Sequence, residues 1–101
     1  MADGVSYASG NWLVTSGSED EFVSRWTDFL QWTREKIAGF QEANLIRDVV
    51  DSRHFVSFAR FDDDASQGAW RSADEWAQKM GACRELCDDF QGGQFTPAAS
   101  V

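Results

Sequence analysis

The stretch that decides the fold runs from His54 to Trp76 and reads HFVSFARFDDDASQGAWRSADEW. Residues 54–61 place aromatic and β-branched side chains on both faces of a predicted strand. The run Asp62–Asp64 then predicts an acidic turn that caps the next helix, rather than a metal site. Trp70 lies in a predicted short helical turn, and Ser72–Glu75 matches a capping box, which predicts that a longer helix begins there.

The chain before this stretch predicts a short strand over residues 11–16, a helix, and a second strand over residues 43–50. A capping box at Ser18–Glu21 predicts the start of the helix, and Gly39 predicts its end. A tight link at residues 51–53 makes the second strand the hairpin partner of residues 54–61. The apolar stripe of this helix comprises Phe22, Trp26, Phe29, Leu30, Thr33 and Ile37, with Trp32 at its margin.

After the stretch, Trp76, Met80, Cys83 and Cys87 form one helical stripe with Leu86 beside it, and a last strand is predicted near Phe95, interrupted by two glycines. The predicted order of elements is strand, helix, strand, strand, helix, strand. This order is typical of an α+β, ferredoxin-like βαββαβ fold with an antiparallel sheet. We expect one domain over residues 1–101, with a loose arm at 1–9 and a tail at 97–101.

Charge and composition exclude several functions. The chain has 17 acidic and nine basic residues, a net charge of -8, and no basic cluster, so we do not expect it to bind nucleic acid. It has no apolar run long enough for a signal peptide or a membrane span, and we expect a soluble, cytoplasmic protein. With one histidine and two cysteines, a four-ligand zinc site is not expected, and Cys83 and Cys87 are interpreted as two buried thiols on one helix face.

Both faces of the predicted hairpin carry apolar residues. Leu45 and Val49 share one face of its first strand, and Ile46 and Val50 share the other. Helices that cover one face of a sheet leave the other face exposed. We therefore expect a homodimer in which a second copy of the chain covers that face.

Three segments together resemble the antibiotic biosynthesis monooxygenase (ABM) family: GSEDEFVSRWTDFLQWT, GFQEANLIRDVVDSRHFVSFARFDD and AWRSADEW. The similarity covers roughly residues 10–96 and rests on patterns rather than on one invariant motif. It implies a dimeric α+β barrel. It also implies a class that includes cofactor-independent oxygenases of polycyclic aromatic compounds, haem-degrading enzymes, and proteins without a known substrate.

In the cofactor-independent members the substrate supplies the chemistry, because a deprotonated anthrone-type phenol can reduce O2 directly. The resemblance implies catalytic roles for Trp70, which matches the family's Trp, and for Asn11, which is taken to match its Asn. Haem-degrading members carry a His where this chain has Met80, so haem degradation is not expected. No cofactor is expected. The residues expected to bind substrate are Trp26, Phe29, Phe58, Trp76 and Met80.

Four polar or aromatic candidates keep structural alternatives. Trp70 could pack the short helix onto the core instead of walling a pocket, and Asn11 could bond its own backbone. His54 could be a solvated or hairpin-pairing side chain rather than a proton carrier. Arg60 shares a strand face with apolar residues, so it must either reach solvent or find an anion, which could be a substrate phenolate or an acidic neighbour such as Asp48.

Two functional hypotheses follow. The first is a cofactor-independent monooxygenase that uses O2 on small aromatic, polyketide-like substrates, with Asn11 polarising an oxygen, Trp70 walling the pocket and Arg60 stabilising an anion. The second is a non-catalytic dimeric domain that binds a ligand or partner, which the small number of residues available for acid-base chemistry favours.

Overall fold

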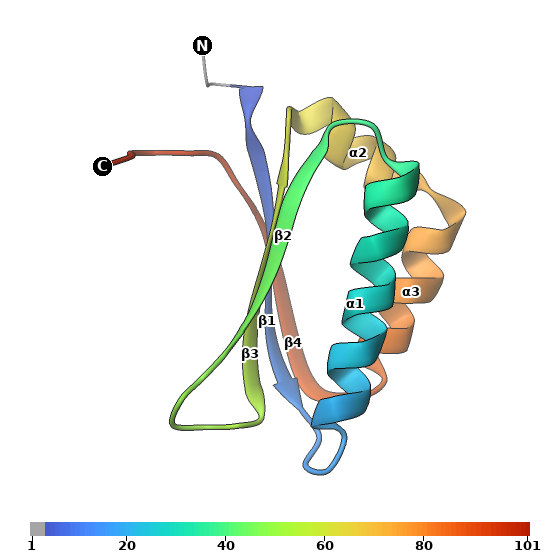
Figure 1. Cartoon of the computed structure of the whole chain (residues 1–101), viewed down its shortest axis with the longest axis vertical. Coiled ribbons are helices and arrows are strands. Elements are labelled where there is room, and N and C mark those ends of the chain that lie inside the picture. The colour runs from blue at the N-terminus through green and yellow to red at the C-terminus, as the bar shows by residue number, and fades with distance from the viewer. Residues whose placement is uncertain (1–3) are drawn as a thin grey trace.

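A four-stranded antiparallel sheet organises the computed structural model, which describes residues 4–101. The strands lie in the order β2-β3-β1-β4, and three helices pack on one side of them (Figure 1). This is the predicted ferredoxin-like α+β fold, with one helix more than expected. The strands are β1 (Ser6–Val14), β2 (Phe40–Arg47), β3 (His54–Phe61) and β4 (Cys87–Phe95), and the helices are α1 (Glu19–Lys36), α2 (Asp64–Ser72) and α3 (Asp74–Arg84).

Helix α1 confirms most of its predicted apolar stripe, since its buried residues are Phe22, Trp26, Phe29, Leu30 and Thr33. Ile37 is the exception, because it follows the helix in an extended conformation and is only partly buried. The helix ends just before Gly39, which has a φ of 90°. Only glycine adopts that conformation without strain. A side chain is also excluded there by space, because a Cβ on Gly39 would lie 2.1 Å from Oγ of Ser66. The turn into β2 therefore depends on this glycine.

Neither predicted capping box forms. Ser18 occupies the N-cap position of α1, but its side chain makes no capping hydrogen bond. The carboxylate of Glu19 instead accepts a hydrogen bond of 2.8 Å from the backbone N–H of Gly17. Ser72 is the last residue of α2, and Ala73 takes the N-cap position of α3. A box needs its serine outside the helix, and the extension of α2 through Ser72 removes that condition.

The acidic turn after β3 caps α2 as predicted. Asp63 accepts a hydrogen bond of 2.8 Å from the backbone N–H of Ser66, and this bond holds the pKa of its carboxyl below the ordinary value. The segment that follows is a nine-residue helix rather than a single turn. Its two buried residues, Gln67 and Trp70, bond to partners far away in the chain, so tertiary contacts extend the helix.

The first strand was predicted too late and too short. It begins at Ser6 rather than near Asn11, so residues 6–9 belong to the sheet and not to a loose arm. Residues 1–3 of that expected arm lie outside the described residues. Ala8, Ser9 and Gly10 are weak strand formers, but β1 pairs with β3 on one side and with β4 on the other. Pairing on both edges compensates for poor local propensity.

The C-terminal prediction also needs two corrections. Helix α3 ends at Arg84, so Cys87 begins β4 instead of extending the helical stripe, and it is only partly buried. Gly92 and Gly93 do not interrupt the last strand but lie within it, paired with Gly10 and Ser9 of β1.

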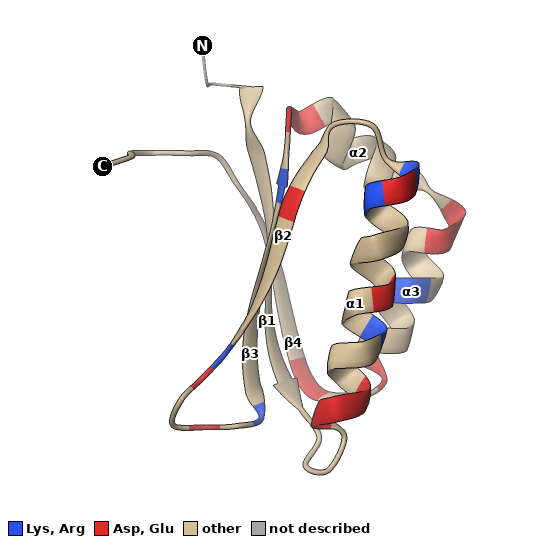
Figure 2. Ribbon diagram, in the orientation of Figure 1, with Lys and Arg blue, Asp and Glu red and all other residues tan. Residues whose placement is uncertain are grey.

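The face of the sheet away from the helices is uncovered in the single chain (Figure 1). We call it the open face. Three large apolar side chains on it are well exposed, namely Ile46 at 54%, Phe58 at 41% and Phe95 at 58%. Acidic residues lie in the first turn of α1, in the β2–β3 turn and at the start of α2 (Figure 2). Within the described part of the chain, no helix is both long and apolar enough to cross a membrane.

Candidate functional site

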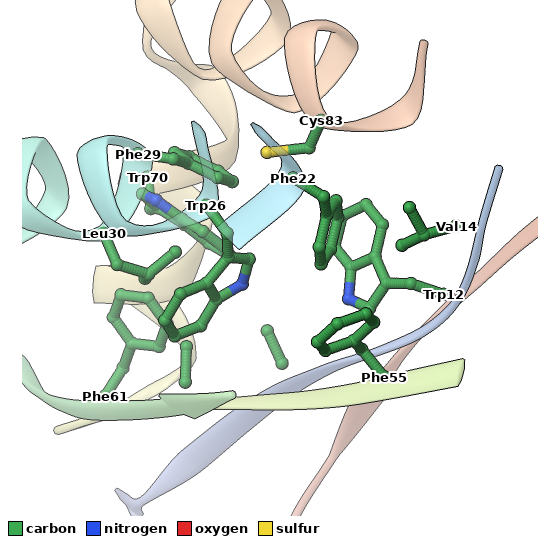
Figure 3. Packing of buried hydrophobic residues seen from close by; sticks show 12 residues of the cluster. Trp12, Val14, Phe22, Trp26, Phe29, Leu30, Phe55, Phe61, Trp70 and Cys83 are labelled. Carbon is green, nitrogen blue, oxygen red and sulfur yellow. The ribbon is translucent and has the colours of Figure 1, made fainter. Parts of the chain in front are cut away.

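A pocket of about 440 Å³ lies between the sheet and the three helices. Its lining is mainly apolar and includes aromatic residues from the sheet and from each of the three helices. Figure 3 shows part of the layer between the sheet and the helices, with Trp12, Phe22 and Phe55 grouped on one side, Phe29, Leu30, Phe61 and Trp70 on the other, and Trp26 between them. The residues expected from the sequence that border the pocket are Trp26, Phe29, Phe58, Trp70, Trp76 and Met80.

The floor of the pocket is open because the sheet presents small residues there. Alternation along β1 and β3 turns Ala8, Gly10, Ser57 and Ala59 toward the helices, and Gly92 pairs with Gly10. A Cβ on Gly10 would lie 2.6 Å from Nε1 of Trp12 and 2.8 Å from Oγ of Ser57. Glycine at this position therefore leaves room for the Trp12 ring beside the pocket.

Trp70 is both a core residue and a pocket residue. Its ring is 6% exposed and packs against Phe29 at 5.5 Å between ring centroids, nearly parallel at 14°. It also meets Trp76 edge to face at 5.9 Å. Its Nε1 donates a hydrogen bond of 2.9 Å to Oγ1 of Thr33. The two interpretations of Trp70 thus describe one side chain that builds the core and borders the pocket.

Phe58 borders the pocket only at its backbone side. Its position in β3 pairs with Ser9 and Asn44, and alternation places its side chain on the open face, where it is well exposed. Trp12 and Phe90, which the sequence interpretation missed, supply aromatic wall in its place, with ring centroids 4.3 Å apart. In the sequence, Trp12 alternates with Gly10 and Phe90 alternates with Gly92. This alternation was not recognised, because the first strand was predicted to start after Gly10.

The charges around the pocket are all positive. Arg71 and Arg84 border it, and in residues 4–101 no aspartate, glutamate or histidine does. Neither arginine forms an ion pair with a carboxylate of those residues. Arg71 lies 5.8 Å from the ring of Trp76, and Arg84 lies 5.2 Å from the ring of Phe90. Burial without a compensating carboxylate lowers the pKa of Arg71 below its ordinary value.

Asn11 and His54 lie on the open face, away from the pocket. Oδ1 of Asn11 is 2.7 Å from Nε2 of His54, and Nδ1 of His54 is 3.0 Å from Oδ2 of Asp48. The His54 bond and two backbone N–H groups lower the pKa of Asp48 to about 2. Asn11 therefore bonds a side chain across the sheet rather than its own backbone, and His54 pairs within the hairpin.

Arg60 also lies on the open face. It pairs in register with Tyr7 and Glu42, and its guanidinium carbon is 6.0 Å from the Tyr7 ring. Asp48, one of its two expected partners, is bonded to His54 instead. Nε of Arg60 is buried and has no hydrogen-bond partner among the described residues. The sheet thus separates Asn11 and Arg60 from the aromatic pocket.

The fold and the pocket together define a class of protein: a ferredoxin-like α+β domain with an aromatic chamber under its helices. The profile of the antibiotic biosynthesis monooxygenase family matches residues 7–81, and the chain belongs to that family. No protein of curated function matches the chain by sequence.

Several solved structures share this fold. A single-residue variant of SnoaB, described as a cofactor-independent oxygenase from Streptomyces nogalater, superposes with a TM-score of 0.88 at 21% identity, over 99% of this chain and 98% of that one. A protein from Shewanella oneidensis gives 0.82 at 16% identity, over 94% and 92% of the two chains. One from Pseudomonas aeruginosa gives 0.78 at 15% identity, over 98% and 99%. At these identities the likeness establishes the fold.

Proposed function

We propose that this protein is a cofactor-independent monooxygenase of small polycyclic aromatic substrates, and that the pocket under the helices is its active site. The observation that carries the proposal is the composition of that pocket, which is walled by Trp12, Trp26, Trp70 and Trp76 and borders two arginines but no carboxylate in the described residues. Aromatic walls suit a flat ring system, and unpaired cations suit an anionic one. Family membership and the oxygenase described among the structural neighbours support the same activity.

The chemistry needs no group beyond the substrate and O2. An anthrone-type substrate carries a CH2 group, and loss of one of its protons gives a delocalised phenolate. The anion donates one electron to O2, and the resulting radical pair combines to form a C–O bond and a hydroperoxide. Loss of the remaining C–H proton and cleavage of the O–O bond release water and leave a C=O group. One oxygen atom thus becomes the oxygen of the new C=O group, the other leaves as water, and the substrate supplies all four electrons.

The chain's own part is to bind and stabilise the anion and to exclude water. The two arginines supply positive charge in a largely apolar chamber, where electrostatic stabilisation is stronger than in water. Trp26, Phe29, Trp76 and Met80 would hold the ring system against Trp70. Asn11 and Arg60 have no contact with this pocket within one chain, so the proposal assigns them no part in the reaction there.

Oxygen uptake by chelator-treated protein with an anthrone-type phenol tests this function. We would compare Gly81→Leu, which adds a side chain at the pocket, with Gly68→Leu, which adds the same side chain outside it. Both glycines are helical, and a Cβ at either meets nothing within 4 Å. Uptake should fall at least about tenfold in Gly81→Leu only. Equal uptake by both variants and the wild type would contradict the assignment of the active site.

One observation favours a second function, a domain that binds an aromatic ligand without turning it over. No residue suited to act as a general base borders the pocket in residues 4–101, so the protein would depend on substrates that are already acidic. Tight binding of several aromatic anions, with no oxygen uptake from any of them, would favour this alternative.

We propose further that the protein is a homodimer joined through the open face. Exposed apolar side chains lie there together with Arg60, whose buried Nε has no hydrogen-bond partner in residues 4–101, and a carboxylate or carbonyl of a second copy could satisfy that donor. Light scattering should give twice the chain mass, and Phe58→Asp should give a monomer. Val49→Asp, in the exposed β2–β3 turn, is the matched control. A monomeric wild type at micromolar concentration would refute the dimer.

A further inference from the structure

We propose that Arg71 and the indole N–H of Trp76 form a carboxylate-recognition group, so that the ligand of the pocket is an aromatic acid bound with its carboxylate at the junction of α2 and α3. The inference deepens the proposed function and rests on it for the use of the pocket. It is carried by how Arg71 is held, by the donors it leaves free and by an unsatisfied donor beside it.

Arg71 is held in place by hydrogen bonds to Gln67, which is itself bonded to Ser6. Oε1 of Gln67 accepts two bonds from the guanidinium, from Nε at 3.1 Å and from Nη2 at 3.0 Å. Nε2 of Gln67 in turn donates a bond of 2.5 Å to Oγ of Ser6 in β1. Both Gln67 and Ser6 are buried. A guanidinium has no acceptor, so the amide oxygen of Gln67 must face Arg71 and its amide nitrogen must face Ser6. This fixes the orientation of the Gln67 side-chain amide.

Within residues 4–101, this arrangement leaves the outer edge of the Arg71 guanidinium, formed by N–H groups of Nη1 and Nη2, without a hydrogen-bond partner. Of its five N–H donors, one on Nε and one on Nη2 are engaged by Gln67. The remaining donors include the pair on Nη1 and Nη2 that binds two oxygens side by side. A carboxylate presents two oxygens at the matching spacing, whereas a single phenolate oxygen uses only part of that edge. A neutral amide, Gln67, orients the cation without neutralising it.

A second donor lies beside Arg71. Nε1 of Trp76 is buried and has no hydrogen-bond partner among the described residues, although Trp76 borders the pocket. Buried indole N–H groups are normally bonded, so an acceptor is missing here. The guanidinium carbon of Arg71 lies 5.8 Å from the Trp76 ring, so one anionic group could meet both side chains. A carboxylate would satisfy the indole and the free guanidinium edge together.

Arg84 provides the competing assignment. Arg84 also borders the pocket, but it is the last residue of α3, whereas Arg71 lies before the first residue of that helix. The two arginines are therefore separated by about the length of α3, roughly 15 Å. Arg84 is exposed and makes no side-chain hydrogen bond in residues 4–101. An exposed cation is screened by water and salt, so Arg84 should discriminate between ligands less well than Arg71, which is partly buried and held by Gln67.

Ligand titration by tryptophan fluorescence tests the assignment. The probes are anthraquinone-2-carboxylate and its carboxamide, which share one ring system and differ in charge. The wild type should bind the carboxylate at least about tenfold more tightly, and Arg71→Gln should abolish that preference while still binding the carboxamide. Arg71→Lys, which keeps the charge but not the two-donor edge, should retain part of it.

The matched control is Arg34→Gln. Arg34 also lies over an aromatic ring, 5.9 Å from Phe40, but it does not border this pocket. The control should keep the full preference for the carboxylate. Equal binding of the two probes by the wild type, failure of both to bind, or loss of the preference in Arg84→Gln instead of Arg71→Gln would each overturn the proposal.

The titration does not depend on catalysis, so the two proposals can fail separately. If Arg71→Gln removes a preference for the carboxylate and no phenol gives oxygen uptake, the recognition group is supported and the proposed oxygenase activity is contradicted. Uptake from a neutral phenol with no carboxylate preference would support the activity and remove the recognition group.

Discussion

Nε1 of Trp70 donates a hydrogen bond of 2.9 Å to Oγ1 of Thr33, and both side chains are buried. The bond joins α2 to α1 at the wall of the pocket. Thr33 in turn donates to the backbone carbonyl of Phe29, one turn earlier in α1. The Thr33 hydroxyl therefore both accepts and donates a hydrogen bond. Sequence periodicity placed Thr33 on the apolar stripe of α1, but its hydroxyl joins two helices.

Replacing that hydroxyl should destabilise the protein through Trp70. Thr33→Val keeps the shape but leaves a buried indole N–H without an acceptor, so the free energy of unfolding should fall by about 1–3 kcal/mol. Urea denaturation followed by circular dichroism measures it. In a Trp70→Phe background the same substitution should cost clearly less, because the orphaned donor is gone. Equal costs in both backgrounds would show that the bond contributes nothing specific.

Alanine substitutions of Gly10, on the pocket floor, and of Gly68, on the surface of α2, should change stability in opposite directions. Gly10→Ala places a Cβ 2.6 Å from Nε1 of Trp12, so it should lower the free energy of unfolding by about 1–3 kcal/mol and weaken ligand binding. Gly68→Ala meets nothing in α2 and should instead raise stability by about 0.5–1 kcal/mol, because alanine is the better helix former. Thermal and urea unfolding of the two variants and the wild type measure these differences in stability. Similar stability in both variants would mean that the Trp12 ring can move away from the added methyl group.

Asp48 should make stability depend on pH in a narrow acidic range. Its pKa is lowered from 3.8 to about 2, first by the hydrogen bond to His54 and then by the backbone N–H groups of Val50 and Asp51. A lowered native pKa stabilises the folded state above the unfolded value and loses that effect as the pH falls through the native one. Asp48→Asn should therefore be less stable than wild type at pH 5, with the difference closing between about pH 4 and pH 2.

The control for this prediction is Glu35→Gln, which removes an exposed carboxylate that forms no ion pair with the described residues. Its stability relative to wild type should not change in the same range. Urea midpoints measured at several pH values compare the three proteins. A gap for Asp48→Asn that persists unchanged down to pH 2 would contradict the assigned cause of the shift.

The two thiols should be unreactive in the folded protein. Burial raises the pKa of Cys83 to about 12 and that of Cys87 to about 11, from an ordinary value of 9.0. The thiolate is the nucleophile, so a rise of two pKa units lowers its population at pH 8 roughly a hundredfold. Mass spectrometry should show slow iodoacetamide labelling in buffer and rapid labelling of both in guanidinium chloride. Rapid native labelling at Cys83 would contradict its burial.

Much of the fold could be predicted from local patterns. The stripe of α1 repeats every three to four residues, so its buried face follows from the sequence alone. The acidic turn was correctly interpreted as a cap, since Asp63 needs only a backbone N–H three residues away. Such features require contacts within one turn of the chain, and the residues that make them are adjacent in sequence. The same patterns supported the family resemblance that the profile match over residues 7–81 confirms.

The composition of the pocket was decided by the tertiary structure. Which face of β1 and β3 each residue occupies depends on a register set by strands far away in sequence. A predicted start at residue 11 instead of Ser6 concealed that register. That register separated Asn11 and Arg60 from the aromatic residues with which sequence reasoning had grouped them. The bonds that fix Arg71 and Trp70 span 61 and 37 residues, from Gln67 to Ser6 and from Trp70 to Thr33. The sequence alone indicated helix α1, the hairpin of β2 and β3 and the cap of α2. Only the packed sheet determined the extent of β1 and α2 and which side chains meet, because contacts between residues distant in sequence form only when the chain folds.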